Sequence, residues 1–125
     1  MRSASRQQLG RHSEALAAAF LSEHGYRLIA RNVRYRAGEL DLIAWDGPVL
    51  CFIEVRATSS EAWGGPLASV TAQKRRRILQ AARGYLSHYP LPEEIRFDVV
   101  AVAWEAGRPA IELIRGAFDA EGLNL

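Results

Sequence analysis

Asp41, Glu54 and Arg56 have types and spacings that suit metal-assisted chemistry on a phosphate. Asp41 lies in the apolar run 39–45 and the other two lie in the run 49–56, and both runs are typical of strands. Because side chains alternate between the two faces of a strand, Glu54 and Arg56 share one face. Magnesium binds through one or two carboxylates together with water and substrate phosphate oxygens. The implied chemistry is phosphodiester hydrolysis, in which a metal activates water and a nearby cation stabilises charge on the phosphate.

The segment between these runs, residues 45–48, predicts a hairpin turn. If Trp45 lies opposite Pro48, then Asp41 lies opposite Phe52 and diagonal to Glu54. Diagonal neighbours have Cα atoms about 7–8 Å apart, so two carboxylates can converge on one cation. The alternative is an edge hairpin whose solvated polar face carries ordinary cross-strand pairs, and spacing alone does not separate the two. The apolar run 50–53 favours a central strand and so tilts the balance toward the metal site.

The composition predicts one globular domain over residues 1–125, with flexible ends at 1–4 and 119–125. Hydrophobic residues make up 49% of the chain and charged residues 24%. Cys51 is the only cysteine, which excludes an intramolecular disulfide, and we expect a buried, inert thiol. Neither a signal peptide nor an apolar stretch of membrane-spanning length is present. We therefore expect a cytoplasmic protein without a membrane partner.

Positive charge is concentrated in two blocks that flank the carboxylates. Residues 1–36 hold seven Arg and two Glu, a net +5, and residues 74–92 hold five basic residues and no acid. Such blocks attract a phosphate backbone, so we expect nucleic acid, DNA in particular, to contact Arg34, Arg36, Lys74, Arg75 and Arg76. The alternative for the run that begins at Lys74 is a solvated helical face.

Periodicity predicts a single α/β unit. The pattern is helical over 5–24, with Gly25 as the C-cap, and again from the N-cap Thr71 to about residue 88. Strands are expected at 26–36, 39–45, 49–56, 95–104 and 110–114, with a loop over 57–69 and a turn over 106–109. Asp98 is expected to pair with a basic side chain rather than to bind a metal.

Several motifs, in order along the chain, resemble the YraN-like family of small uncharacterised bacterial proteins. They are GELDLIA at 38–44, FIEVR at 52–56, WGGP at 63–66, FDVVAV at 97–102 and IRGAF at 114–118. That family is similar to the restriction-endonuclease superfamily and, within it, to the archaeal Holliday-junction resolvases. The resemblance covers about Gly10 to Phe118. It implies an α/β fold of the restriction-endonuclease type, a three-layer α/β/α sandwich around a mixed, roughly five-stranded sheet.

The resemblance also implies a Mg²⁺ or Mn²⁺ site in which Glu14 from the first helix joins Asp41 and Glu54. Without this resemblance, we would expect Glu14 to be an ordinary solvated glutamate on a helix. Arg56 stands where the superfamily has lysine, and arginine cannot give up a proton to act as a base, although it can still stabilise phosphate charge. Fifteen of the sixteen basic residues are arginine, so a drift of the whole composition toward arginine is the competing explanation for the arginine at position 56. Lys74, beside Gln73 in the first turn of the second helix, is a candidate for the missing ammonium, and a plain surface lysine is the alternative.

These expectations lead to a magnesium-dependent, endonuclease-like protein that acts on nucleic acid, with branched DNA as one substrate class. The resemblance to junction-cleaving proteins allows a homodimer. Two alternatives stay open. One is a nucleic-acid-binding module that has kept the fold and lost turnover, and the other is a protein-interaction scaffold with a remnant site.

Overall fold

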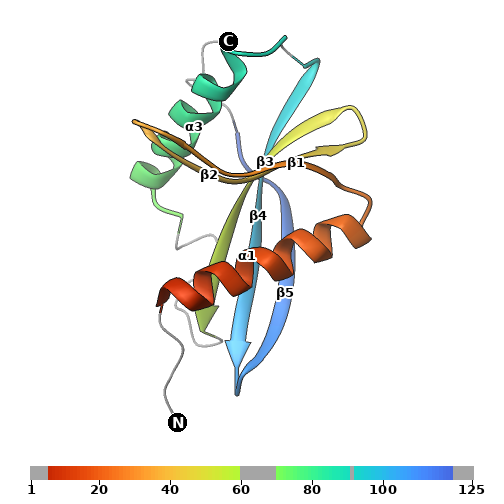
Figure 1. The fold of residues 1–125 in the computed structure, drawn as a ribbon, viewed down its shortest axis with the longest axis vertical. Helices are drawn as coiled ribbons and strands as arrows, with labels where there is room; N and C mark the ends of the chain where they lie inside the picture. The colour runs from red at the N-terminus through yellow and green to blue at the C-terminus, as the bar shows by residue number, and fades with distance from the viewer. Residues whose placement is uncertain (1–5, 60–69, 91, 120–125) are drawn as a thin grey trace.

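The computed structural model of the protein describes residues 6–59, 70–90 and 92–119 (Figure 1). The predicted loop 57–69 and the predicted flexible ends therefore fall mostly outside the described residues. The elements along the chain are α1 (Arg6–Glu23), β1 (Arg27–Tyr35), β2 (Gly38–Asp46), β3 (Val49–Ser59), α3 (Ala72–Leu86), β4 (Glu94–Glu105) and β5 (Arg108–Phe118).

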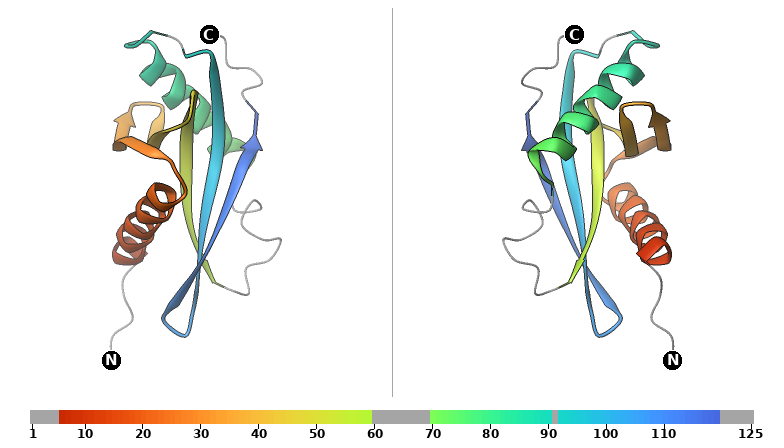
Figure 2. Two further views of the ribbon diagram at one scale, coloured as in Figure 1. Left: turned by 90° about the vertical axis from the view of Figure 1, so that its right-hand side faces the viewer. Right: turned by 90° about the vertical axis from the view of Figure 1, so that its left-hand side faces the viewer.

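The strands form one five-stranded sheet in the order β1-β2-β3-β4-β5. The β3 and β4 strands are parallel, and the other neighbours are antiparallel. The connection between the parallel strands passes through α3, as a parallel pair requires a crossover. Helices α1 and α3 pack on opposite faces of the sheet (Figure 2). The predicted three-layer α/β/α sandwich with a mixed sheet is confirmed.

Each face of the sheet has its own apolar core. Ala17 and Leu21 of α1 pack on Leu42 and Ile53 on one face, whereas α3 covers Phe52 and its neighbours on the other. Local signals in the sequence account for the start of α3 and the end of α1. Thr71 caps α3 by accepting the backbone N–H of Lys74 at 3.2 Å. Gly25 has φ +88° just after α1, a conformation that a glycine C-cap permits.

The hairpin between β2 and β3 has a different register from the one that the sequence predicts. Asp46 pairs with Val49 and Trp45 with Leu50, so the predicted register with Trp45 opposite Pro48 is wrong by two residues. The loop consists of Gly47 and Pro48 alone. Gly47 has φ +60°, and proline is held at negative φ, a combination typical of a type II′ turn.

The last turn is shorter and the last strand longer than the sequence predicts. The predicted turn at 106–109 contains only two turn residues, Ala106 and Gly107, both with positive φ (50° and 75°), as in a type I′ turn. Glu105 therefore pairs with Arg108, and β5 runs on to Phe118 rather than ending at Ile114.

The sheet forks between β2 and β3. Their pairing ends at Leu42 and Ile53, whereas β1 and β2 stay paired to Tyr35 and Gly38. The free end of the β1–β2 hairpin reaches α3 (Figure 1). There Gly38 permits close approach, because a Cβ at this position would lie 2.8 Å from the Arg77 carbonyl oxygen. The fork creates a space that α1, the hairpin, β3 and α3 all border.

Candidate functional site

A cleft of about 810 Å³ lies at the fork and collects charged residues from five elements. Its acidic lining consists of Glu14, Glu39, Asp41 and Glu54, and its basic lining of Arg11, Arg34, Arg56, Lys74 and Arg77. Glu14 comes from α1, Arg34 from β1 and Lys74 from α3, so residues far apart in the sequence meet here. All four residues that the sequence analysis assigns to catalysis lie in this one cleft.

Asp41 is fixed by the fork itself. The residues of β2 that precede Leu42 are not paired with β3, and the backbone N–H of Val55 donates instead to the side-chain Oδ2 atom of Asp41 at 2.9 Å. Continuing the observed register places Asp41 directly opposite Glu54, rather than diagonal to it as predicted. Burial raises the pKa of Asp41, while the Val55 N–H acts to lower it.

Glu54 is nearly buried, with 7% of its surface exposed. Its Oε1 atom lies 3.7 Å from Arg56 and 3.9 Å from the Lys74 ammonium, both longer than a direct hydrogen bond. Burial, followed by the charge of Asp41, raises the pKa of Glu54 to about 8, although Lys74 lowers it. The loss of hydration and the interaction with Asp41 together outweigh the effect of the two cations on this pKa. In the absence of a metal, Glu54 is the carboxyl of this pair that retains a proton.

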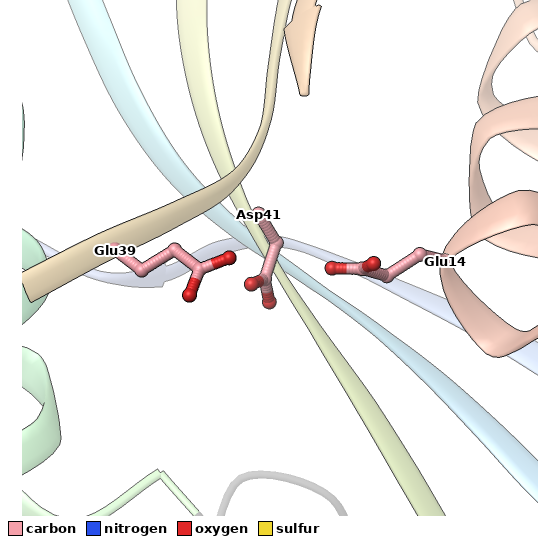
Figure 3. Close-up of side chains that lie close together, drawn as sticks. All are labelled: Glu14, Glu39 and Asp41. Carbon is pink, nitrogen blue, oxygen red and sulfur yellow. The ribbon is translucent and has the colours of Figure 1, made fainter. Parts of the chain in front are cut away.

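Three carboxylates of the cleft, one of them Asp41, lie close together. Glu14, Glu39 and Asp41 each offer an oxygen atom, and these atoms lie within 4.8 Å of one another. Glu39 and Glu14 point toward Asp41 from opposite sides, one from β2 and the other from α1 (Figure 3). Burial raises the pKa of Glu14, and the charges of Asp41 and Glu39 raise it further. An all-oxygen set of this kind fits a hard divalent cation such as Mg²⁺ or Mn²⁺.

Glu39 is absent from the site residues that the sequence analysis assigns. The sequence does contain a signal for this residue. Glu39 lies two residues before Asp41, and residues two apart on a strand share a face. Arg11 and Arg77 are also missed, because the helical pattern does not reveal which polar face borders the cleft. Their addition raises the number of basic residues in the cleft to five.

The basic residues predicted to contact nucleic acid fall into two groups. Arg34 and Lys74 line the cleft, and Arg34 forms an exposed ion pair with Glu39 at 3.5 Å. Arg36 and Arg76 are exposed outside its lining, as is the auxiliary candidate Gln73. Arg75 also lies outside it: the guanidinium stacks over the Phe118 ring, 5.6 Å from its centroid, and Nε donates to the Val70 carbonyl at 3.1 Å.

Asp98 has the structural role that the sequence predicts. It is fully buried and accepts from Arg96 Nε at 2.8 Å, from the Tyr26 hydroxyl at 2.9 Å and from the Gly116 backbone N–H at 2.9 Å. Arg96 also donates to Asp46 at 2.7 Å. The network satisfies the buried charge of Asp98 and joins the strands, and none of its residues lines the cleft.

Comparison with known proteins gives a consistent family match. The model of the uncharacterised protein family UPF0102 matches residues 13–102. The UPF0102 protein of Anaeromyxobacter dehalogenans (strain 2CP-C) is 51% identical over 118 residues, covering 94% of this chain and 88% of the relative. The UPF0102 protein of Chlorobium phaeobacteroides (strain BS1) is 52% identical over 95 residues, covering 75% of each chain. Among the described residues, no helix has the length and apolar character needed to cross a membrane.

Proposed function

For this chain, which belongs to the UPF0102 family, we propose a metal-dependent endonuclease-like function on nucleic acid, with DNA as the substrate. The observation that carries the proposal is the convergence of four carboxylates and five basic side chains in the cleft at the fork. Carboxylates alone attract cations, and basic side chains alone attract phosphate. A cleft that contains both carboxylates and basic side chains suits a reaction that brings a cation and a phosphodiester together.

Asp41 and its neighbours would hold the cation. Asp41 contributes to both acidic groups, since it lies within the three-carboxylate cluster and is also adjacent to Glu54. A bound Mg²⁺ would supply Lewis acidity toward the phosphate and a water of lowered pKa. The carboxylates would hold the cation, and their charge would attract it into a cleft that is also lined with arginine.

Lys74 and Arg56 would stabilise the phosphate. Both lie beside Glu54, on α3 and β3 respectively, so the cleft contains an ammonium even though position 56 holds arginine. The ammonium acts as a compact point charge, and the planar guanidinium can donate two parallel hydrogen bonds to phosphate oxygens. The proposal therefore assigns to Lys74 the role that the superfamily gives to the lysine after the third-strand glutamate.

A cleavage screen tests this function. Single-stranded, duplex, flapped and four-way DNA substrates are incubated with the wild-type protein in Mg²⁺, in Mn²⁺ and in EDTA. We expect metal-dependent cleavage that is lost in Glu54→Ala and Asp41→Asn but kept in Glu112→Gln, a matched change on the exposed side of β5. Cleavage that survives both cleft substitutions would contradict the assignment, because it would arise elsewhere or from a contaminant.

A nucleic-acid-binding module without turnover is the second candidate. The observation in its favour is Arg56, because arginine cannot serve as a base. Arg56→Lys distinguishes the two functions: in a working nuclease the substitution keeps or raises metal-dependent cleavage, whereas in an inactive module it restores none and binding persists. An absence of salt-dependent DNA binding would instead favour the protein-interaction scaffold.

A further inference from the structure

Asn32 has a backbone conformation that its position in β1 does not require. Its φ is 52°, in the left-handed region that L-residues rarely adopt. Among the described non-glycine residues, only Ala106 shares a positive φ, and Ala106 lies in the tight turn between β4 and β5, where the turn type demands it. Asn32 instead lies inside a strand, between two residues that are paired with β2. Local strain that no turn explains often accompanies a role for the side chain.

The side chain of Asn32 connects two of the clustered carboxylates. With the amide nitrogen turned toward the cluster, Nδ2 donates to Glu14 Oε1 at 3.0 Å and to Glu39 Oε1 at 3.1 Å. The opposite orientation would place the amide oxygen against carboxylate oxygens, with no donor between them. Because an amide nitrogen carries two hydrogens, both bonds form at once. One neutral side chain thereby links a carboxylate on α1 to a carboxylate on β2.

The strand register explains why position 32 can do this. Arg31 pairs with Leu42 and Val33 with Leu40, so Asn32 lies opposite Asp41, the third member of the cluster. Asparagine combines a tolerance of positive φ with an NH₂ group that glycine lacks. The two hydrogen bonds also offset the repulsion among three carboxylates whose oxygens lie within 4.8 Å of one another.

From this arrangement we infer that Asn32 is a positioning residue for the cation site, holding the Glu14 and Glu39 carboxylates in the orientation that faces Asp41. The inference rests on the proposed function, since it assumes that these carboxylates bind a divalent cation. It assigns no contact between Asn32 and the cation. Removing a hydrogen-bond partner of a metal-binding side chain typically weakens metal affinity about 10–100-fold.

Asn32→Gly tests the inference without endangering the fold, because glycine adopts positive φ freely. Binding of Mn²⁺ is measured by isothermal titration calorimetry, and the thermal unfolding midpoint is measured in EDTA. We expect the dissociation constant of the variant to rise about 10–100-fold, with an unfolding midpoint close to that of the wild type. Ala106→Gly is the matched control, since it relieves the same kind of backbone strain outside the cleft and should leave Mn²⁺ affinity unchanged.

The possible outcomes distinguish a failure of the proposed cation site from a failure of the role assigned to Asn32. Wild-type protein that binds no Mn²⁺ overturns the proposed cation site, and the role of Asn32 with it. Wild-type protein that binds Mn²⁺ with an affinity equal to that of Asn32→Gly overturns the role of Asn32 alone. An equal loss of affinity in Ala106→Gly would also overturn it, because the effect would then come from backbone strain rather than from the amide.

Discussion

Replacing Glu54 with glutamine should stabilise the metal-free protein at alkaline pH. Burial and the charge of Asp41 raise the pKa of Glu54 to about 8. A carboxyl whose pKa is raised on folding contributes stability that is complete below its unfolded pKa of 4.5 and is lost as the pH rises through about 8. Glutamine stays neutral, so the variant does not undergo this loss.

The shift of Glu54 sets the size of the effect. A rise in pKa from 4.5 to about 8, at about 1.4 kcal/mol per pH unit, gives an upper limit of about 5 kcal/mol. The net gain is smaller because Asp41 shares the proton and because glutamine loses the charge interactions with Lys74 and Arg56. We expect about 2 kcal/mol at pH 8.5, which for a chain of this length raises the unfolding midpoint by about 6–10 °C.

Urea and thermal unfolding in EDTA at pH 4.5 and pH 8.5 measure this difference. We expect Glu54→Gln to match the wild type at the lower pH and to exceed it at the higher one. Glu112→Gln, an exposed change on β5, should match the wild type at both. Equal pH dependence in Glu54→Gln and the wild type, or a loss of stability at pH 8.5, would refute the view that Glu54 is retained at a cost in stability.

Three further predictions concern the elements around the cleft. Gly38→Ala should lower the free energy of unfolding by about 1–3 kcal/mol in urea titrations, because its Cβ would lie 2.8 Å from a backbone oxygen of α3. An unchanged midpoint would contradict the close contact between the hairpin and the helix. Tyr26→Phe should cost about 1–3 kcal/mol by removing a donor to buried Asp98, whereas Tyr89→Phe, at an exposed position, should cost little; equal effects would contradict the role of the network. Lys74→Ala should reduce the slope of log binding constant against log salt concentration by about one unit for DNA binding. An unchanged slope would contradict a contact between this ammonium and a phosphate.

The sequence predicts the elements and the shared strand face, because both follow from periodicity. Asp41 and Glu54 lie on the same face in either register, since a shift of two residues leaves the alternation of side chains unchanged. The distance between them was not predictable in the same way. It depends on which two residues form the turn. The predicted register places Asp46 and Gly47 there, whereas in the structure the turn consists of Gly47 and Pro48, with glycine supplying the positive φ.

Most of the missed residues depend on geometry that local patterns do not encode. Nothing in the strand pattern of β1 predicts the positive φ of Asn32 or its hydrogen bonds to two carboxylates. The alternation of β2 places Glu39 beside Asp41, but it does not show that Glu14 of α1 joins them. The direction of a basic side chain on α3 depends on how the helix is rotated over the sheet. That rotation points Lys74 into the cleft and leaves Arg75 over Phe118.

The most direct test of the cation site is a crystal of the protein with a bound oligonucleotide, soaked in Mn²⁺ and measured for anomalous scattering. Bound phosphate is included because substrate oxygens commonly complete such a site. We expect a peak at coordination distance, about 2 Å, from an oxygen of Asp41 and from at least one of Glu14, Glu39 and Glu54. The peak should disappear in Asp41→Asn. A complex that shows no peak beside Asp41 would contradict the central claim.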